Sequence, residues 1–138
     1  MKLFLVVFCL FCSSFVRAQS LSRDNLFGLH VIEVELNPGV SMESFTSFFV
    51  DEVIPEYEKH WIGLKGHLIK SVRGEFKGKF AIVWVFFNEP TRDYYFTKED
   101  KANELEIVAL DKVKPIEEQL KKKFGSYSVT YMDDWVVL

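Results

Sequence analysis

Three histidines are the first side chains in this chain of 138 residues that could bind a metal ion or transfer a proton. His30 and Glu33 are three residues apart in a segment typical of a strand, so they point to opposite faces and cannot converge on one ion. His60 and His67 stand near the ends of two other predicted elements, and no His-x-His or His-Glu-x-x-His pattern occurs. We therefore expect no metal site.

Five side chains on or near the predicted strands can form a pocket instead: Glu33, His67, Arg73, Trp84 and Tyr131. The strand pattern permits all five to share one face of a sheet. Such a pocket offers a carboxylate, an imidazole and aromatic walls, which can bind an apolar ligand or accept a proton. The competing interpretation is structural: Glu33 pairs with Arg73 while the rings pack. We favour it, because no spacing among these residues requires chemistry.

Other kinds of catalysis lack their sequence signatures. No serine lies in a Gly-x-Ser-x-Gly elbow and no glycine-rich phosphate loop is present. Both cysteines, Cys9 and Cys12, lie within residues 1–18, the segment that is interpreted below as a cleaved signal peptide. We therefore assign no catalytic residue and expect no cofactor. These absent signatures favour a protein that is not an enzyme.

Residues 1–18 have the pattern of a secretory signal peptide. A basic Lys2 precedes nine apolar residues at 3–11, and the small residues Val16 and Ala18 predict cleavage before Gln19. The alternative is a membrane anchor, but nine residues in a helix rise only about 14 Å, roughly half of a bilayer's hydrocarbon core. We expect an exported protein, periplasmic or extracellular, with no membrane anchor after cleavage.

Cleavage would change the composition of the working protein. The whole chain has a net charge of −3, two cysteines and 14 phenylalanines. The predicted signal peptide holds both cysteines, four phenylalanines and two basic residues but no acidic one, so its loss lowers the charge from −3 to −5. An acidic protein lacks the basic surface that nucleic acid requires. We therefore expect no nucleic-acid partner.

Residues 19–138 form one predicted domain with the element order βαββαβ. Strands are expected at 29–36, 67–74, 80–87 and 127–132. Helices are expected at about 42–60, where Pro55 should cause a kink, and from a capping box at 97–100 to 124, after a short helical segment at 92–96. This order predicts an α+β, ferredoxin-like fold, a four-stranded antiparallel sheet with both helices on one face.

The third predicted strand, FAIVWVFF at 80–87, is apolar on both faces. Two helices can cover only one face of a sheet, whereas a strand facing water on one side would alternate with polar residues. The second face therefore needs another cover, and an identical subunit is the simplest one. We expect a homodimer that forms through the sheet.

Four segments, LHVIEVELNPG, FVDEVIPEYEKH, FAIVWVFFN and YSVTYM, resemble the dimeric α+β barrel superfamily, which includes antibiotic-biosynthesis-monooxygenase-like and NIPSNAP-like domains. The resemblance covers about residues 27–132 and implies two sheets packed face to face, often enclosing a small hydrophobic ligand. For haem-degrading members it also implies an Asn, a Trp and a His. Asn25 and Trp84 can take the first two places, but residues 88–124 contain no histidine, so haem degradation is not expected.

These observations predict an exported dimeric α+β barrel protein that binds a small hydrophobic ligand or serves as an assembly module. One alternative is a cofactor-independent monooxygenase or isomerase with Glu33 or His67 as the proton acceptor. A second is a protease inhibitor similar to a propeptide, with its inhibitory segment at 133–138. Fold alone does not choose among them.

Overall fold

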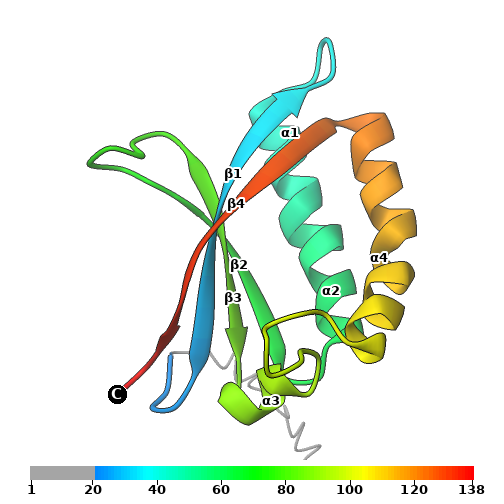
Figure 1. Ribbon diagram of the computed structural model, residues 1–138. Helices are drawn as coiled ribbons and strands as arrows, with labels where there is room; N and C mark the ends of the chain where they lie inside the picture. Colours follow the sequence, from blue (N-terminus) through cyan, green and yellow to red (C-terminus); the bar gives the residue numbers. More distant parts are fainter. Residues whose placement is uncertain (1–20) are drawn as a thin grey trace, which may run out of the picture.

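The computed structural model describes residues 21–138, which form one sheet with helices against one of its faces (Figure 1). The sheet order is β2-β3-β1-β4, and every neighbouring pair is antiparallel. Its strands are β1 (Leu26–Leu36), β2 (Leu64–Lys70), β3 (Phe80–Phe86) and β4 (Gly125–Val136). Two helical units cover one face of the sheet and leave the other face open. This arrangement confirms the predicted α+β ferredoxin-like fold. The predicted signal peptide lies outside the described residues.

The first helical unit consists of α1 (Met42–Phe48), a π-helical turn η1 (Phe49–Val53) and α2 (Ile54–His60). Ser41 caps its start by accepting a hydrogen bond from the Ser44 N–H at 3.1 Å. Pro55 lies in the first turn of α2, directly after the π-helical turn. Proline has no N–H and its ring clashes with the carbonyl four residues earlier, so the expected irregularity takes the form of a wider turn.

The second helical unit begins later than the sequence predicts. Helix α4 spans Glu104–Lys123, and its N-cap is Asn103, whose side chain accepts hydrogen bonds from two N–H groups of the first turn. The predicted capping box at 97–100 is wrong: Thr97 accepts from the Glu99 and Lys101 N–H groups within a turn, and Asp100 has a left-handed φ of 55°. Short helix α3 (Glu89–Asp93) precedes this connection. No helix among residues 21–138 is long and apolar enough to cross a membrane.

Strand β4 is longer than predicted and carries a bulge. Its pairing with β1 shifts between Gly28 and His30, so that His30 lies opposite Tyr131 whereas Gly28 lies opposite Asp134. The bulge keeps both Tyr131 and Asp134 on the helix side of the sheet. Residues 134–136, predicted as part of an inhibitory tail, are paired with the start of β1 as the end of this strand.

The core between the sheet and the helices has two clusters. One joins Ile32 and Leu120 to the fully buried Phe45, Phe49 and Val53 of the first helical unit. The other gathers at the α3 end of the sheet, around Leu26, Trp61, Leu64, Phe86, Tyr95, Ala109 and Val113. Val34 and Leu36 also pack against the first cluster. The first cluster closes one end of the space between the two layers, and the second borders a cavity.

Candidate functional site

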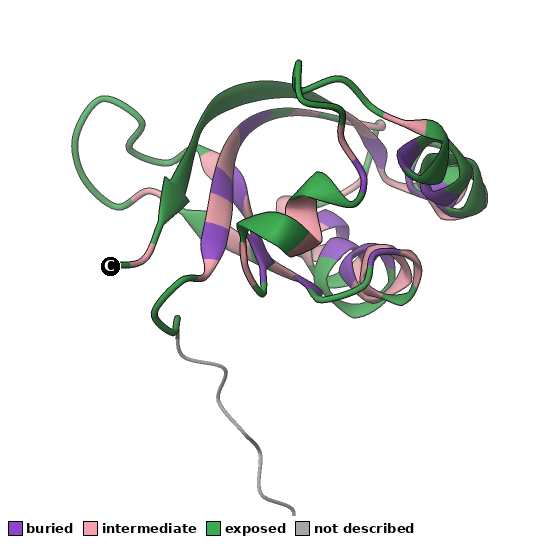
Figure 2. Cartoon of the chain, turned by 60° about the horizontal axis from the view of Figure 1, so that its bottom comes forward, coloured by how far each residue is buried: buried purple, intermediate pink, exposed green. Residues whose placement is uncertain are grey.

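A cavity of about 1190 Å³ lies between the sheet and the helices at the α3 end of the molecule. Its walls come from all four strands, from α2, α3 and α4, and from the connection 94–103. In Figure 2, α3 stands across the space that is bordered by the curved sheet and the two long helical units. The cavity is therefore formed within one chain, on the helix side of the sheet.

Three stacked aromatic rings form its inner wall. The ring of Tyr57 lies between Trp61, with centroids 5.1 Å apart, and Trp84, with centroids 5.0 Å apart. Gly66 of β2 makes room for this stack, because a Cβ there would stand 2.4 Å from the indole of Trp84. An L side chain at position 66 would push Trp84 out of the stack.

The hydroxyl groups of the inner wall are held by one carboxylate. Tyr57 and Tyr127 both donate to Oε1 of Glu117, at 3.0 and 2.8 Å. Burial, together with the negative charge of Glu117, raises the pKa of Tyr57 well above its usual range, and burial likewise raises that of Tyr127. These two phenols therefore stay protonated and serve to orient the rings.

Glu106 is a buried acid in the cavity wall, with a relative exposure of 8%. The indole N–H of Trp61 donates to its Oε2. Burial raises the pKa of Glu106, while the Trp61 hydrogen bond and the positive charge of Arg92 oppose that shift. The wall thus holds a carboxyl group whose ionised form is costly unless a positive charge lies near it.

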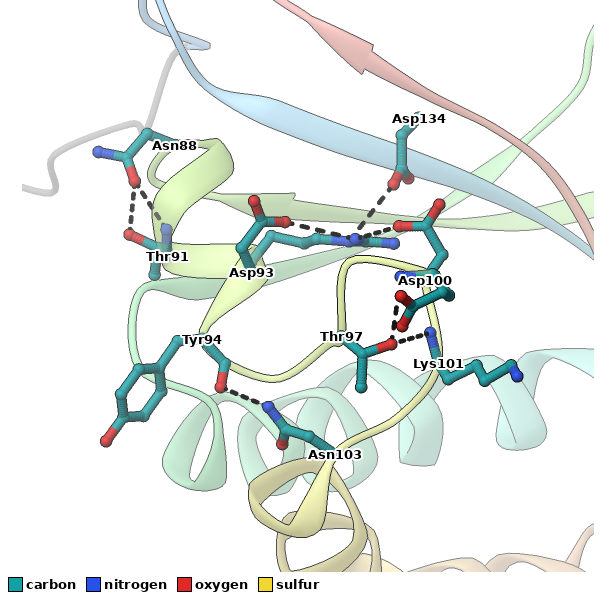
Figure 3. A network of polar contacts seen from close by, with 11 residues as sticks. Asn88, Thr91, Asp93, Tyr94, Thr97, Asp100, Lys101, Asn103 and Asp134 are labelled. Atoms are coloured by element: carbon teal, nitrogen blue, oxygen red, sulfur yellow. Dashed lines mark hydrogen bonds and ion pairs between the residues drawn. The ribbon is translucent and has the colours of Figure 1, made fainter.

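Arg92 is the centre of a polar network at the cavity rim (Figure 3). Its guanidinium is 2.7 Å from Asp100, 3.4 Å from Asp93 and 3.7 Å from Asp134, and it lies over the ring of Phe96 at 4.3 Å. Figure 3 shows the three aspartates approaching from α3, from the connection and from β4. The network therefore ties the connection to the sheet across the rim of the cavity.

His30 and Asp134 both lie beside Gly28 on the sheet. A Cβ at Gly28 would stand 2.8 Å from Asp134 Oδ1 and 3.2 Å from His30 Nε2, so the missing side chain leaves room for both groups. The ring of Tyr131 packs edge-on against His30, with centroids 5.3 Å apart. Burial lowers the pKa of His30, although Asp134 opposes that shift. His30 is consequently a neutral imidazole at neutral pH.

The structure separates the five residues that the sequence placed on one face. Trp84 and Tyr131 line the cavity on the helix side. Glu33 and His67 fall on the open face, because strands alternate and their neighbours Ile32 and Leu68 pack against the helices. The prediction that all five residues share one face of the sheet was therefore wrong.

The pair of Glu33 with Arg73, predicted at a dimer contact, is not formed within the chain. Glu33 binds Lys79 at 2.9 Å, whereas Arg73 lies in the exposed loop between β2 and β3. Asn25, considered above for haem chemistry, donates to the Phe87 carbonyl at 2.8 Å and does not line the cavity. Any role of these residues toward a ligand stays a prediction.

Sequence reasoning missed Tyr57, Trp61, Arg92, Glu106 and Asp134 as site residues. A pattern that identifies Glu106 was present: counting back from Leu120 at helical spacing through Ile116, Val113 and Ala109 leads to position 106. The same helix also carries the apolar residues Leu105 and Val108, which are exposed, so apolar character alone does not identify its inner face. Asp134 had no comparable pattern, because the bulge decides which face it occupies.

No protein-family model matches the chain, and no curated protein is similar to it in sequence. Solved structures similar to this chain include the following two. A point mutant of SnoaB, a cofactor-independent oxygenase from Streptomyces nogalater, is 12% identical over 80% of this chain and 92% of that one, with a TM-score of 0.43. A dimeric protein of unknown function and ferredoxin-like fold from Bacteroides fragilis is 11% identical over 83% and 97%, with a TM-score of 0.31.

Proposed function

We propose that this protein binds a small, flat and largely apolar molecule in the cavity between its sheet and its helices. The observation that carries the proposal is a cavity of about 1190 Å³ with a wall of three stacked rings and polar groups around its rim. Ligand sites are typically concave and apolar, with a few convergent polar groups, and hold several hundred Å³. The aromatic wall favours a planar ligand, because rings stack with an offset at small cost in side-chain entropy.

Binding is favoured over catalysis because most acid–base groups of the wall already have partners. Glu117 accepts from two tyrosines, Glu106 accepts from Trp61, and Arg92 is surrounded by carboxylates. His30 is the exception, since a neutral imidazole in the wall can accept a proton. A cofactor-independent monooxygenase or isomerase is therefore the second candidate, with His30 in the role first considered for Glu33 or His67.

A neutral fluorescent dye tests the binding proposal. N-phenyl-1-naphthylamine should brighten when it is mixed with the protein, and Leu110→Trp should abolish the increase by filling the cavity that Leu110 lines. Leu105→Trp is the matched control, because Leu105 is exposed on the same helix without lining the cavity. If the dye does not bind, or if both variants bind it like the parent protein, the cavity is not a ligand site.

We further propose that two copies pack through the open face of the sheet. Apolar side chains lie on that face of β1, β3 and β4, among them Leu29, Val83, Phe87 and Trp135, the last two of which are 68% and 54% exposed. A patch of this kind on the far side from the helices is typical of a subunit contact. Sedimentation should give twice the monomer mass, and Val83→Lys should give the monomer. Val72→Lys, in the exposed loop between β2 and β3, is the control.

Export stays part of the proposal, and it rests on the sequence of residues 1–18. N-terminal sequencing of the protein recovered from the periplasm or the medium should begin at Gln19. Recovery of a chain that still begins at Met1 in the cell interior would contradict it. We do not propose protease inhibition, because residues 134–136 are held as a paired strand.

A further inference from the structure

The cavity wall carries more negative than positive side chains. Two basic residues line it, Arg92 and Lys98, against five acidic ones: Glu89, Asp93, Asp100, Glu106 and Asp134. His30 adds no positive charge at neutral pH, because burial lowers its pKa. A ligand that enters the cavity therefore meets an excess of carboxylates.

Arg92 is not free to bind an anionic ligand. Its side chain is only 15% exposed, its guanidinium bonds to Asp100 at 2.7 Å, and the ring of Phe96 covers it at 4.3 Å. Asp93 and Asp134 stand at 3.4 and 3.7 Å. A carboxylate or phosphate on a ligand would have to displace these aspartates and would face their repulsion. Lys98, the other cation, is an exposed residue of the connection.

Glu106 offers an acceptor inside the cavity. Trp61 occupies its Oε2, and no protein donor to Oε1 is found among residues 21–138. Within the same residues no fully buried side-chain oxygen or nitrogen lacks a partner, so Oε1 is reachable from the cavity that Glu106 lines. A carboxylate oxygen on a side chain that is only 8% exposed is thus directed to whatever occupies the cavity.

The rings beside Glu106 suit the same kind of ligand. Aromatic faces carry a negative quadrupole and attract organic cations such as quaternary ammonium groups. Tyr57 and Trp84 belong to the cavity wall, and Trp61 both stacks on Tyr57 and donates to Glu106. Trp61 and Trp84 cover the two faces of Tyr57, so apolar surface, stacked aromatic rings and an available carboxylate oxygen lie together.

We infer that the ligand of this cavity is an organic cation with a flat apolar body, an amine or quaternary ammonium compound, held by Glu106 and the surrounding aromatic rings. This inference rests on the proposed function, because it names the ligand class of the same cavity. It excludes anionic aromatic compounds of the same size, which would meet five carboxylates and an occupied guanidinium.

Three probes of similar shape test the inference by competing with the neutral dye. They are phenyltrimethylammonium, its neutral isostere tert-butylbenzene, and benzenesulfonate. In competition with the dye, we expect the cation to bind with about tenfold higher affinity than the neutral isostere. This factor corresponds to a contribution of about 1.4 kcal/mol from the cation–π and carboxylate contacts. Benzenesulfonate should not compete, and added salt should weaken the cation alone.

Variants locate the effect. Glu106→Gln should reduce the affinity for the cation about tenfold and leave that for the neutral isostere unchanged. Asp134→Asn, which removes a carboxylate from β4 instead of α4, should act in the same direction. Glu118→Gln, on the exposed side of α4, is the matched control. Thermal melts of each variant show whether it is folded.

The outcomes separate the two proposals. If the dye does not bind the folded parent protein, the proposed function fails. If the dye binds but the neutral isostere or the sulfonate competes as well as the cation, the cavity still binds ligands and only the inference is overturned. An equal loss of affinity for the cation and for the neutral isostere in Glu106→Gln also overturns the inference. The residue would then act through the shape of the cavity and not through its charge.

Discussion

The two ends of the space between sheet and helices differ in how completely they are filled. At one end, Phe45, Phe49 and Val53 are fully buried against Ile32 and Leu120. At the other end the rings of Tyr57, Trp61 and Trp84 border a cavity. The buried residues of the packed end are all apolar, whereas the open end adds charged groups that cannot be packed dry without a large desolvation cost.

The sheet itself contributes to this difference. At the packed end β1 presents Ile32, Val34 and Leu36 to the helices, but at the open end it presents Gly28 and His30. Gly28 has no side chain to fill the space, and the part of β4 beside it leaves Tyr131 half exposed. The comparison indicates that one end is packed as a core and the other leaves a cavity, the one in which we propose that a ligand binds.

The largest expected effect is at the packed end. Phe49→Ala should lower the free energy of unfolding by about 3–5 kcal/mol, because it leaves a cavity in a fully buried cluster. Phe96→Ala, at the rim of the open end, is the comparison and should cost less than half of that, since Phe96 is partly buried. Chemical denaturation measures both. Equal losses would show that the two ends do not differ in packing.

A smaller effect on the free energy of unfolding, of opposite sign, is expected for a substitution at Glu106 in the open end. The folded protein holds the pKa of Glu106 above its ordinary value of 4.5, so it binds this proton more tightly than the unfolded chain does. The free energy of unfolding should therefore fall as the pH rises from 4.5 through the raised pKa.

Glu106→Gln removes this fall of the free energy of unfolding with pH, because an amide does not ionise. Its side-chain oxygen can still accept the hydrogen bond from the indole N–H of Trp61. It should stabilise the free protein by about 1 kcal/mol at neutral pH and leave its stability at pH 4 unchanged. Thermal melts across this pH range, with Glu118→Gln as the control, check the prediction. A loss of stability at neutral pH would contradict it and would show that ionised Glu106 is well solvated in the free protein.

The smallest effect is expected on the open face of the sheet. Glu33 is bound to Lys79 at 2.9 Å, and the lysine lowers the pKa of Glu33, but both side chains are largely exposed. Solvent screening makes such pairs weak. Glu33→Gln should leave both the melting temperature and dye binding unchanged. A change in dye binding would place part of the ligand site on the face where the sequence first suggested it.

Local patterns predicted the elements better than they predicted the site. The alternation in 29–36, the apolar segment 80–87 and the helical spacing along 42–60 each depend on neighbours in the chain, and each led to the correct element. The start of α4 was missed because Thr97 and Asn103 are both good capping residues, and only the turn around Asp100 decides between them. Two equally good local patterns cannot be separated without tertiary contacts.

The sequence by itself determined the element order, the antiparallel α+β architecture and the need to cover a strand that is apolar on both sides, because these follow from periodicity and turn chemistry. Only the tertiary structure decided where the cavity lies. A bulge in β4 turns Asp134 toward Gly28 and His30, and helix packing brings Glu106 to Trp61. Those neighbours are distant in the chain, and a shift of one residue in a strand exchanges its two faces.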